Sequence, residues 1–193
     1  MARHLLLSER TLLEIIEHEA IVREAYKDSK GIWTWGVGVT NDSGHDVFPR
    51  YHRKPATLEK VLAVFEWLLR TKYLPEVRRA FEGVTLSEAQ LAGALSFHWN
   101  TGSIGEAFWV KSFLAGNLDA AYREFMNWST PQEIIGRRRL ERALFFKGTW
   151  TSDGFVTLIE RVHRNGNPDW SSRRQIDIRP QLRAAFARSE IAA

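Results

Sequence analysis

Apolar residues follow two different periods along the chain. Four apolar residues between positions 12 and 16 lie at helical spacing, which predicts a helix over residues 8–19 with Ser8 as its N-cap. From about residue 23 to 40 the residues are mainly β-branched, aromatic or glycine around a Lys-Asp-Ser-Lys-Gly turn signal, so a small sheet of two or three short strands is expected. Residues 41–55 are polar and predict a loop with one short helical turn.

Helical spacing returns between residues 57 and 148. Thr57 is the expected cap of a long helix that Pro75 should end or kink, because proline lacks a backbone donor. The segments 85–88 and 130–133 have the Ser/Thr-x-x-Glu form of capping boxes and predict the starts of two further helices. The helices expected in this part of the chain cover about 57–73, 75–81, 85–101, 105–114, 118–128 and 130–146.

The last 43 residues have a different pattern. Residues 155–162 and 171–178 alternate loosely between apolar and polar, and an Asn-Gly-Asn-Pro turn lies between them at 165–168, which predicts a β-hairpin. A short helix over about 180–187 should follow. Because an isolated hairpin is marginally stable in water, we expect residues 151–193 to form an extension packed on a domain of residues 1–150.

Composition narrows the class of protein. The chain has 193 residues of which 44% are hydrophobic, enough for a sizeable core, and it has no cysteine, so disulfides and thiolate metal sites are excluded. None of the six histidines lies in a metal-ligand pattern, and we expect no metal and no cofactor. No apolar run suits a membrane span or a signal peptide, so we expect synthesis in the cytoplasm without stable membrane insertion. The net charge of +4 is compatible with nucleic acid, anionic lipid or an anionic cell-wall polymer.

Two carboxylates near the start of the chain have opposed surroundings. Glu19 follows an amphipathic helix whose C-terminal dipole, neighbouring glutamates and apolar residues all favour the protonated form. Asp28 lies between two lysines in a polar turn, which favours the carboxylate. Glycoside hydrolysis needs such a pair, one acid and one base, and the hydroxyl of Thr34 is suited to hold a water near Asp28.

The same stretch resembles the active-site segment of the phage-type lysozymes, a glycoside hydrolase family (family 24) that includes many endolysins. That family has Glu, eight residues, Asp, five residues, Thr and then Gly-x-Gly, which match Glu19, Asp28, Thr34, Gly36 and Gly38. Later segments also resemble the family: the Phe-x-x-Asn-x-Gly stretch at 97–102, the arginine-rich helix at 136–145 and the Lys-Gly-Thr-Trp segment at 147–150. The resemblance covers about residues 8–150.

This resemblance implies a fold, a reaction and a set of site residues. The fold would be α+β and mainly α, lysozyme-like, with a small N-terminal β lobe, a larger helical lobe and a cleft between them. Glu19 would be the general acid, Asp28 the base or electrostatic partner, and Thr34 the residue that positions water, for hydrolysis of the β-1,4 bond between N-acetylmuramic acid and N-acetylglucosamine in peptidoglycan. An arginine of 137–139 would pair with Glu19. The residues expected to bind substrate or support the site are Gly36, Gly38, Asn100, Arg137 and Trp33.

The resemblance also implies how such an enzyme works in its biological setting. It would act as a monomer on the cell wall after release from a bacterial host, with release by a holin as one route; a prophage-derived or secretion-associated muramidase is another. Two residues depart from the family pattern: Ala20 replaces a glycine and Val39 replaces a histidine. They motivate an alternative, a lysozyme-fold protein that binds peptidoglycan or a partner without turnover. A basic nucleic-acid-binding protein is a third interpretation, but no aromatic-lined basic groove is evident, and we expect no nucleic-acid partner.

Overall fold

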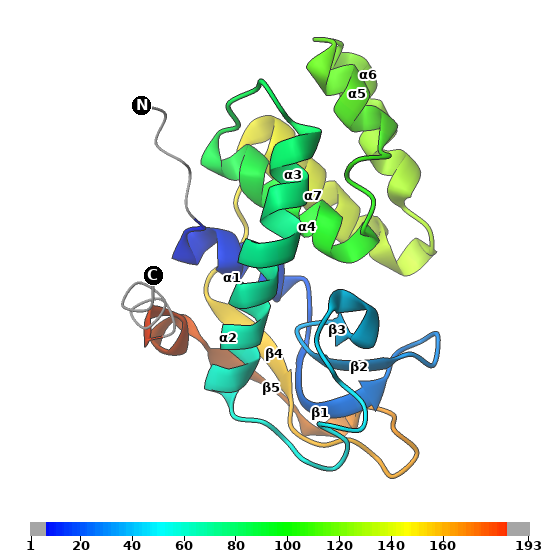
Figure 1. The fold of residues 1–193 in the computed structure, drawn as a ribbon, viewed down its shortest axis with the longest axis vertical. Helices are drawn as coiled ribbons and strands as arrows, with labels where there is room; N and C mark the ends of the chain where they lie inside the picture. Colours follow the sequence, from blue (N-terminus) through cyan, green and yellow to red (C-terminus); the bar gives the residue numbers. More distant parts are fainter. Residues whose placement is uncertain (1–6, 185–193) are drawn as a thin grey trace. The chain divides into compact units, whose positions relative to one another are not determined.

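The computed structural model describes residues 7–184 (Figure 1). These residues form two compact units, each built from two separate stretches of the chain. Unit 1 contains the described residues up to 15 together with Leu69–Thr151, and unit 2 contains Ile16–Leu68 together with the described residues from 152 onward. The fold class predicted from the sequence is confirmed, because the chain is mainly helical with a small five-stranded sheet.

Unit 1 is helical. Its central helix, α4 (Glu88–Thr101), is buried on all sides between Leu91 and Trp99, where the sequence is small or apolar except at His98. It packs against α7 (Ile135–Lys147). The remaining helical elements of the unit are η2 (Leu69–Tyr73), α3 (Leu74–Ala80), α5 (Phe108–Leu114), α6 (Leu118–Glu124), η3 (Phe125–Trp128) and η4 (Gln132–Ile134).

The helix starts in this unit were predicted with mixed success. Ser87, and not Thr85, caps α4: its hydroxyl accepts from the N–H of Gln90 at 3.2 Å, and the Gln90 side chain accepts from the Ser87 N–H at 2.9 Å. The capping box at 130–133 was also wrong, because Pro131 precedes a short 3-10 turn without a side-chain cap and the α-helix begins at Ile135. The interruption near Pro75 is confirmed as a π-helical turn, η2, directly before it.

Aromatic side chains fill the core of unit 1. Trp109 lies at the centre, fully buried, with ring centroids 4.6 Å from Phe125, 4.9 Å from Phe145 and 5.3 Å from Phe97. Offset and edge-on ring pairs of this kind add to the stability that burial already provides. The core therefore joins α4, α5, η3 and α7.

Unit 2 is built on a five-stranded sheet with the order β3-β2-β1-β4-β5 (Figure 1). The strands are β1 (Ile21–Lys27), β2 (Trp33–Gly36), β3 (Val39–Thr40), β4 (Phe155–Ile159) and β5 (Arg173–Asp177). All neighbouring pairs are antiparallel except β1 and β4, which are parallel. The helical elements that accompany the sheet are α2 (Leu58–Leu68), η1 (Asn41–Ser43) and η5 (Trp170–Ser172).

The C-terminal hairpin is confirmed, and it completes the sheet rather than standing alone. β4 and β5 pair in register from Phe155–Asp177 to Ile159–Arg173, while β4 also pairs with β1 through Ile21–Leu158 and Val22–Ile159. The apolar strand β4 is thus hydrogen-bonded on both sides. The helix expected over 180–187 is present at 179–184, and the rest of that range lies outside the described residues.

The first helix, α1 (Glu9–Glu17), begins in unit 1 and ends in unit 2. Ser8 caps it as predicted, since its hydroxyl accepts from the N–H of Thr11 at 3.1 Å. The helix is two residues shorter at its C-terminal end than expected, so Glu19 lies beyond the last turn, where its N–H donates to the carbonyl of Ile16 at 2.9 Å.

None of the helices within residues 7–184 combines the length and the apolar character that a membrane span requires.

Candidate active site

Asp28 lies in the turn that joins β1 to β2. Its N–H donates to the Ile32 carbonyl at 3.0 Å, and its own carbonyl accepts from Gly31 at 2.9 Å, where a φ of +77° makes glycine the suitable residue. The carboxylate closes the turn, because Oδ1 accepts from the N–H groups of Lys30 and Ile32, each at 2.9 Å. Within residues 7–184, the hydrogen bonds to this carboxylate all fall on Oδ1, which leaves Oδ2 available for chemistry.

Thr34 lies directly across the hairpin from Tyr26, in the register Tyr26–Thr34. Its side chain is 4% exposed, and its hydroxyl donates to the Ile32 carbonyl at 3.1 Å. The hydroxyl hydrogen is therefore committed to the turn, and the oxygen lone pairs remain to accept a hydrogen bond from a water molecule.

Tyr26 of β1 interacts electrostatically with both Glu19 and Asp28. Burial raises the pKa of the Tyr26 phenol well above its ordinary value, and the negative charges of Glu19 and Asp28 raise that pKa further. Both carboxylates therefore lie within electrostatic reach of one phenol group. Tyr26 was not among the residues predicted for the site.

Two glycines and a tryptophan fix the hairpin that carries Thr34. Gly36 and Gly38 have φ values of +64° and +74° around the tight connection from β2 to β3, and a Cβ at Gly36 would lie 3.1 Å from Val61 of α2. Trp33 stacks on Phe48 with ring centroids 4.6 Å apart. The structure thus gives Gly36, Gly38 and Trp33 a positioning role in unit 2, and contact of Trp33 with substrate stays a prediction.

Asn100 and Arg137, predicted to support the site, belong to a buried polar network in unit 1. Glu141, fully buried in α7, accepts at Oε1 from Arg137 Nε at 2.8 Å and from the Ser96 hydroxyl at 2.7 Å. Its Oε2 accepts from Arg138 Nη1, and Arg138 Nη2 donates to Asn100 Oδ1 at 2.6 Å. Burial lowers the pKa of Arg138, and the charge of Glu141 opposes that shift.

The arginine run at 137–139 is therefore divided. The side chains of Arg137 and Arg138 are 10% and 0% exposed, whereas Arg139 is exposed. Arg137 and Arg138 form hydrogen bonds within the buried network and do not form a surface patch. Arg138 and Glu141 were missed as site-supporting residues, although their spacing of three along a helix is the one signal that could have found them. The pairing of Arg137 with Glu19 stays a prediction.

His98, near Asn100 in sequence, has a structural role. It is 1% exposed, its Nδ1 accepts from the Ile104 N–H at 3.4 Å, and its Nε2 lies 2.6 Å from Glu76 Oε2. An acceptor at Nδ1 places the proton of the neutral ring on Nε2, which donates to Glu76. Burial lowers the pKa of His98, and the hydrogen bond to Glu76 opposes this.

The two departures from the family pattern are accommodated locally. Among the described residues other than glycine, only Arg53 has a positive φ, so Ala20 occupies no conformation that requires glycine. Val39 is buried and pairs with Trp35 across β2 and β3, so it contributes to the sheet core. Neither substitution distorts the hairpin.

These features define the chain as a protein of the lysozyme-like fold class. Residues 16–142 match the phage lysozyme family, and the chain belongs to that family. The matched range contains Glu19, Asp28 and Thr34. Comparison with curated protein sequences gave no match.

Solved structures of three proteins share the fold. An endolysin from Escherichia coli O157:H7 phage FAHEc1 aligns with a TM-score of 0.62 and 22% identity, covering 77% of this chain and 98% of that one. A P22 lysozyme variant aligns with a TM-score of 0.56 and 25% identity, covering 73% and 98%. The muramidase domain of SpmX from Asticaccaulis excentricus aligns with a TM-score of 0.57 and 22% identity, covering 73% and 97%. Family and fold together support lysozyme-type hydrolysis of peptidoglycan, a glycoside hydrolase activity.

Proposed function

We propose that this protein is a muramidase that hydrolyses the β-1,4 bond between N-acetylmuramic acid and N-acetylglucosamine in bacterial peptidoglycan. The proposal rests above all on the Glu19, Asp28 and Thr34 spacing of the family. In support, the charges of Glu19 and Asp28 both contribute to the raised pKa of Tyr26. Most glycoside hydrolases use a pair of carboxyl groups that flank the scissile bond.

Glu19 is the proposed general acid. It lies just beyond the C-terminus of α1, and it is partly buried. In this role it donates its proton to the glycosidic oxygen as the bond to the sugar breaks, so that the leaving group departs as a neutral hydroxyl.

Asp28 and Thr34 are proposed to act together on the opposite side of the reaction. Asp28 Oδ1 is held by two backbone N–H groups, which fixes the carboxylate and directs its chemistry to Oδ2. A water that donates one hydrogen to Asp28 Oδ2 and the other to the Thr34 oxygen would have a lone pair directed outward, toward the anomeric carbon. Asp28 also stabilises the positive charge that develops on the sugar.

The other predicted residues have supporting roles in this proposal. Gly36, Gly38 and Trp33 hold the hairpin, while the Arg138–Glu141 network holds Asn100 and Arg137 on α4 and α7. Every acid, base and positioning group comes from a side chain, so the proposed reaction uses no metal and no cofactor. In this proposal peptidoglycan is the substrate and the enzyme acts as a monomer after it reaches the wall, with release through a holin as one route and secretion as another.

Product analysis tests the proposal. Purified peptidoglycan is digested with the protein, and the products are reduced with borohydride and identified by mass spectrometry. Muramitol at the new reducing ends supports cleavage on the proposed side of the muramic acid. Glucosaminitol ends would refute the bond assignment, and an absence of new reducing ends would favour the alternative, a lysozyme-fold protein that binds without turnover.

A further inference from the structure

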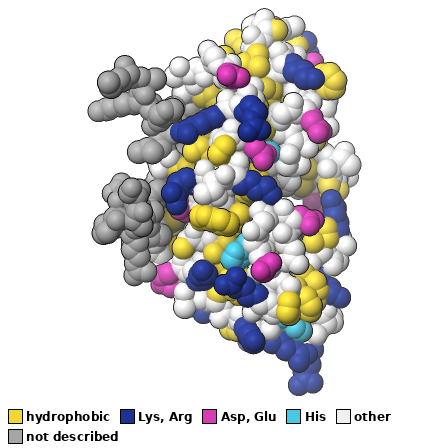
Figure 2. All heavy atoms as spheres, in the orientation of Figure 1, with side chains coloured by type: hydrophobic (Ala, Val, Ile, Leu, Met, Phe, Trp, Pro, Cys, Tyr) yellow, Lys and Arg dark blue, Asp and Glu magenta, His cyan; other side chains and the backbone are white. Residues whose placement is uncertain are grey.

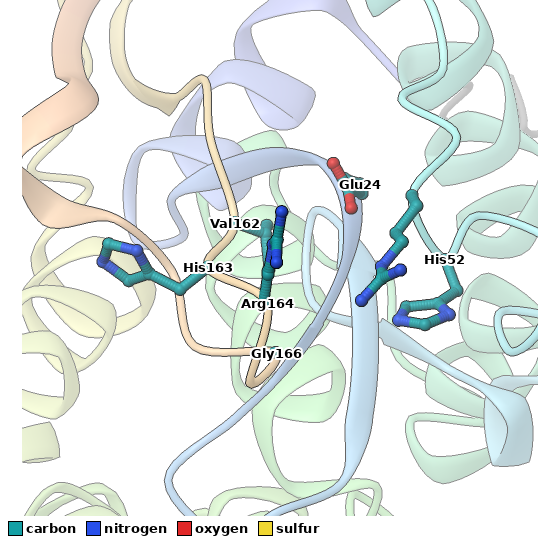
Figure 3. A pocket seen from close by; sticks show the side chains of 7 residues that line it. Glu24, His52, Val162, His163, Arg164 and Gly166 are labelled. Atoms are coloured by element: carbon teal, nitrogen blue, oxygen red, sulfur yellow. The ribbon is translucent and has the colours of Figure 1, made fainter.

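A pocket lies in unit 2 beside the hairpin of β1 and β2. It has a volume of about 290 Å³, and its lining includes Glu24, His52, Arg53, Arg164 and Gly166. Figure 3 shows Glu24 and His52 on one side of this pocket and Arg164 on the other. The two walls come from segments more than 100 residues apart, the loop that precedes α2 and the turn between β4 and β5.

Strand β1 holds both walls in place. The N–H of Ala25 donates to the Tyr51 carbonyl at 3.0 Å, next to His52, and the N–H of Lys27 donates to the Gly166 carbonyl at 2.8 Å. Glu24, the neighbour of Ala25 on β1, also lines the pocket. Because a regular hydrogen bond fixes each wall to the same strand, the pocket is a built feature of the fold.

Gly166 shows how closely the second wall fits. Its φ is +91°, and a Cβ at this position would lie 3.2 Å from both Lys27 Cγ and Trp33 Cη2. The turn therefore rests directly on the hairpin of β1 and β2. The wall is made by the C-terminal extension, so the pocket exists only because residues 152–184 complete the sheet.

The lining of the pocket is basic. Arg53 and Arg164 contribute two guanidinium groups, His52 contributes an imidazole, and Glu24 is the single carboxylate. Within residues 7–184, neither Arg53 nor Arg164 forms an ion pair, so both guanidinium groups are available to a ligand. His163 also lines the pocket, but its ring turns away from Glu24 and His52 (Figure 3).

The surface around the pocket is also positively charged. On the face shown in Figure 2, Lys and Arg side chains gather at the lower end of the view, where Figure 1 shows the loops on either side of β1 in cyan and orange. Positive charge concentrated around a concave site attracts anions and raises their local concentration.

We propose that this pocket binds a phosphate group, either free or as an ester. A guanidinium group donates two parallel hydrogen bonds to a phosphate, and two such groups on opposite walls, with His52 beside them, can satisfy a tetrahedral anion from two sides. A planar carboxylate needs only one of the two guanidinium groups. For an enzyme that acts on the cell wall, the corresponding ligand is a phosphate ester of an envelope polymer or of a lipid headgroup.

Phosphate binding by the full-length protein tests the proposal directly. Isothermal titration calorimetry at constant ionic strength measures the affinity for inorganic phosphate and for glycerol 3-phosphate. We expect saturable binding of both, and about tenfold weaker binding in the double variant Arg53→Gln, Arg164→Gln, because each lost charge-assisted pair contributes strongly. The matched control is Arg139→Gln, Arg173→Gln, which removes the same charge from two exposed positions outside the pocket.

A single substitution of Glu24 should change the phosphate affinity in the opposite direction. Glu24→Gln removes the one repelling charge and should strengthen phosphate binding about threefold. An effect of misfolding cannot produce a gain in affinity, so this variant keeps the test informative if the double arginine variant is unstable. Vesicles of phosphatidylglycerol provide a second arm: binding that depends on Arg53 and Arg164 identifies a lipid phosphate as the source, whereas binding of the soluble ester alone identifies a wall polymer.

Several outcomes would overturn the proposal. They are no saturable phosphate binding by the wild type, an equal loss of affinity in the pocket and control double variants, or unchanged affinity in Glu24→Gln. The proposal is independent of catalysis: hydrolysis of phosphate-free peptidoglycan should be unchanged in Glu24→Gln. A protein that binds phosphate without cleaving peptidoglycan would refute the proposed muramidase activity and leave the phosphate site standing.

Discussion

Glu141→Gln is expected to destabilise unit 1 severely. The carboxylate of Glu141 is fully buried and accepts hydrogen bonds from Arg137, Arg138 and Ser96. Glutamine keeps the shape but removes the charge, and it leaves the fully buried guanidinium of Arg138 without a counter-ion. Breaking a buried pair in this way costs about 3–5 kcal/mol.

The size of the effect can be converted into a melting temperature. For a chain of this length each kcal/mol shifts the midpoint by about 2–4 °C, so the expected fall is roughly 6–20 °C. Thermal unfolding followed by circular dichroism at 222 nm measures it, because unit 1 is helical. Glu160→Gln is the matched control: it breaks the exposed ion pair with Arg174, 2.7 Å long, and should cost at most about 1 kcal/mol.

A double-mutant cycle decides whether the pair itself is responsible. Arg138→Met removes the stranded charge, so Glu141→Gln should cost clearly less in that background than in the wild type. A loss in Glu141→Gln no larger than in Glu160→Gln would contradict the reasoning, and so would additive losses in the cycle. Either result would mean that the network does not hold α4 and α7 together.

Three further predictions follow from local geometry. Gly93→Ala should lower the free energy of unfolding by about 1–2 kcal/mol, because the new Cβ would lie 3.0–3.2 Å from Phe145 and the backbone of α7. Gly136→Ala has open space around the new Cβ and should raise the free energy of unfolding by up to about 1 kcal/mol. Equal effects of the two substitutions in chemical denaturation would contradict this. Thr34→Val should lower kcat on peptidoglycan about 100-fold while Thr34→Ser retains most activity, and equal rates in the two variants would argue against a water-positioning hydroxyl. Burial lowers the pKa of His98, so the unfolded state binds a proton at this residue more readily than the folded state. The contribution of His98 to stability is therefore complete above the ordinary histidine pKa of about 6.5 and is lost as the pH falls below it. Denaturant titrations from pH 7.5 to 5.5 should show that the free energy of unfolding depends less steeply on pH in His98→Gln than in the wild type.

Most of the secondary structure could be predicted from the sequence because apolar spacing is a local signal. The helices of unit 1 and the terminal hairpin were found in this way. The capping boxes were less predictable, because Thr85 and Ser87 both fit an N-cap and only the hydrogen bonds with Gln90 select Ser87. A pattern shared by two nearby residues cannot decide which one the folded chain uses.

Sequence patterns could not predict which strands distant in the chain pair with each other. Nothing local indicates that β4 lies parallel to β1, more than 130 residues earlier, yet this pairing makes the extension part of the sheet. Arg138 and Glu141 were equally hidden, because an arginine and a glutamate three residues apart on a helix usually form an exposed pair. Burial of both groups follows from the packing of α7 on α4 and not from their spacing.

The proposed site depends more on family resemblance than on physical pattern. The roles of Glu19, Asp28 and Thr34 stay a prediction, and the structure adds how Asp28 and Thr34 are held in the hairpin. It also adds Tyr26, which only becomes visible once the hairpin register places it across from Thr34. A tyrosine in a strand carries no distinguishing signal, because strands favour aromatic residues everywhere.

Turnover of purified peptidoglycan by Glu19→Gln and Asp28→Asn is the most direct measurement of the central claim. Released muropeptides are quantified against wild type and against Glu24→Gln, which removes a carboxylate from the same hairpin outside the proposed chemistry. We predict that both site variants lose about 100-fold or more in rate while Glu24→Gln matches the wild type. Activity in Glu19→Gln equal to that of Glu24→Gln would contradict the account.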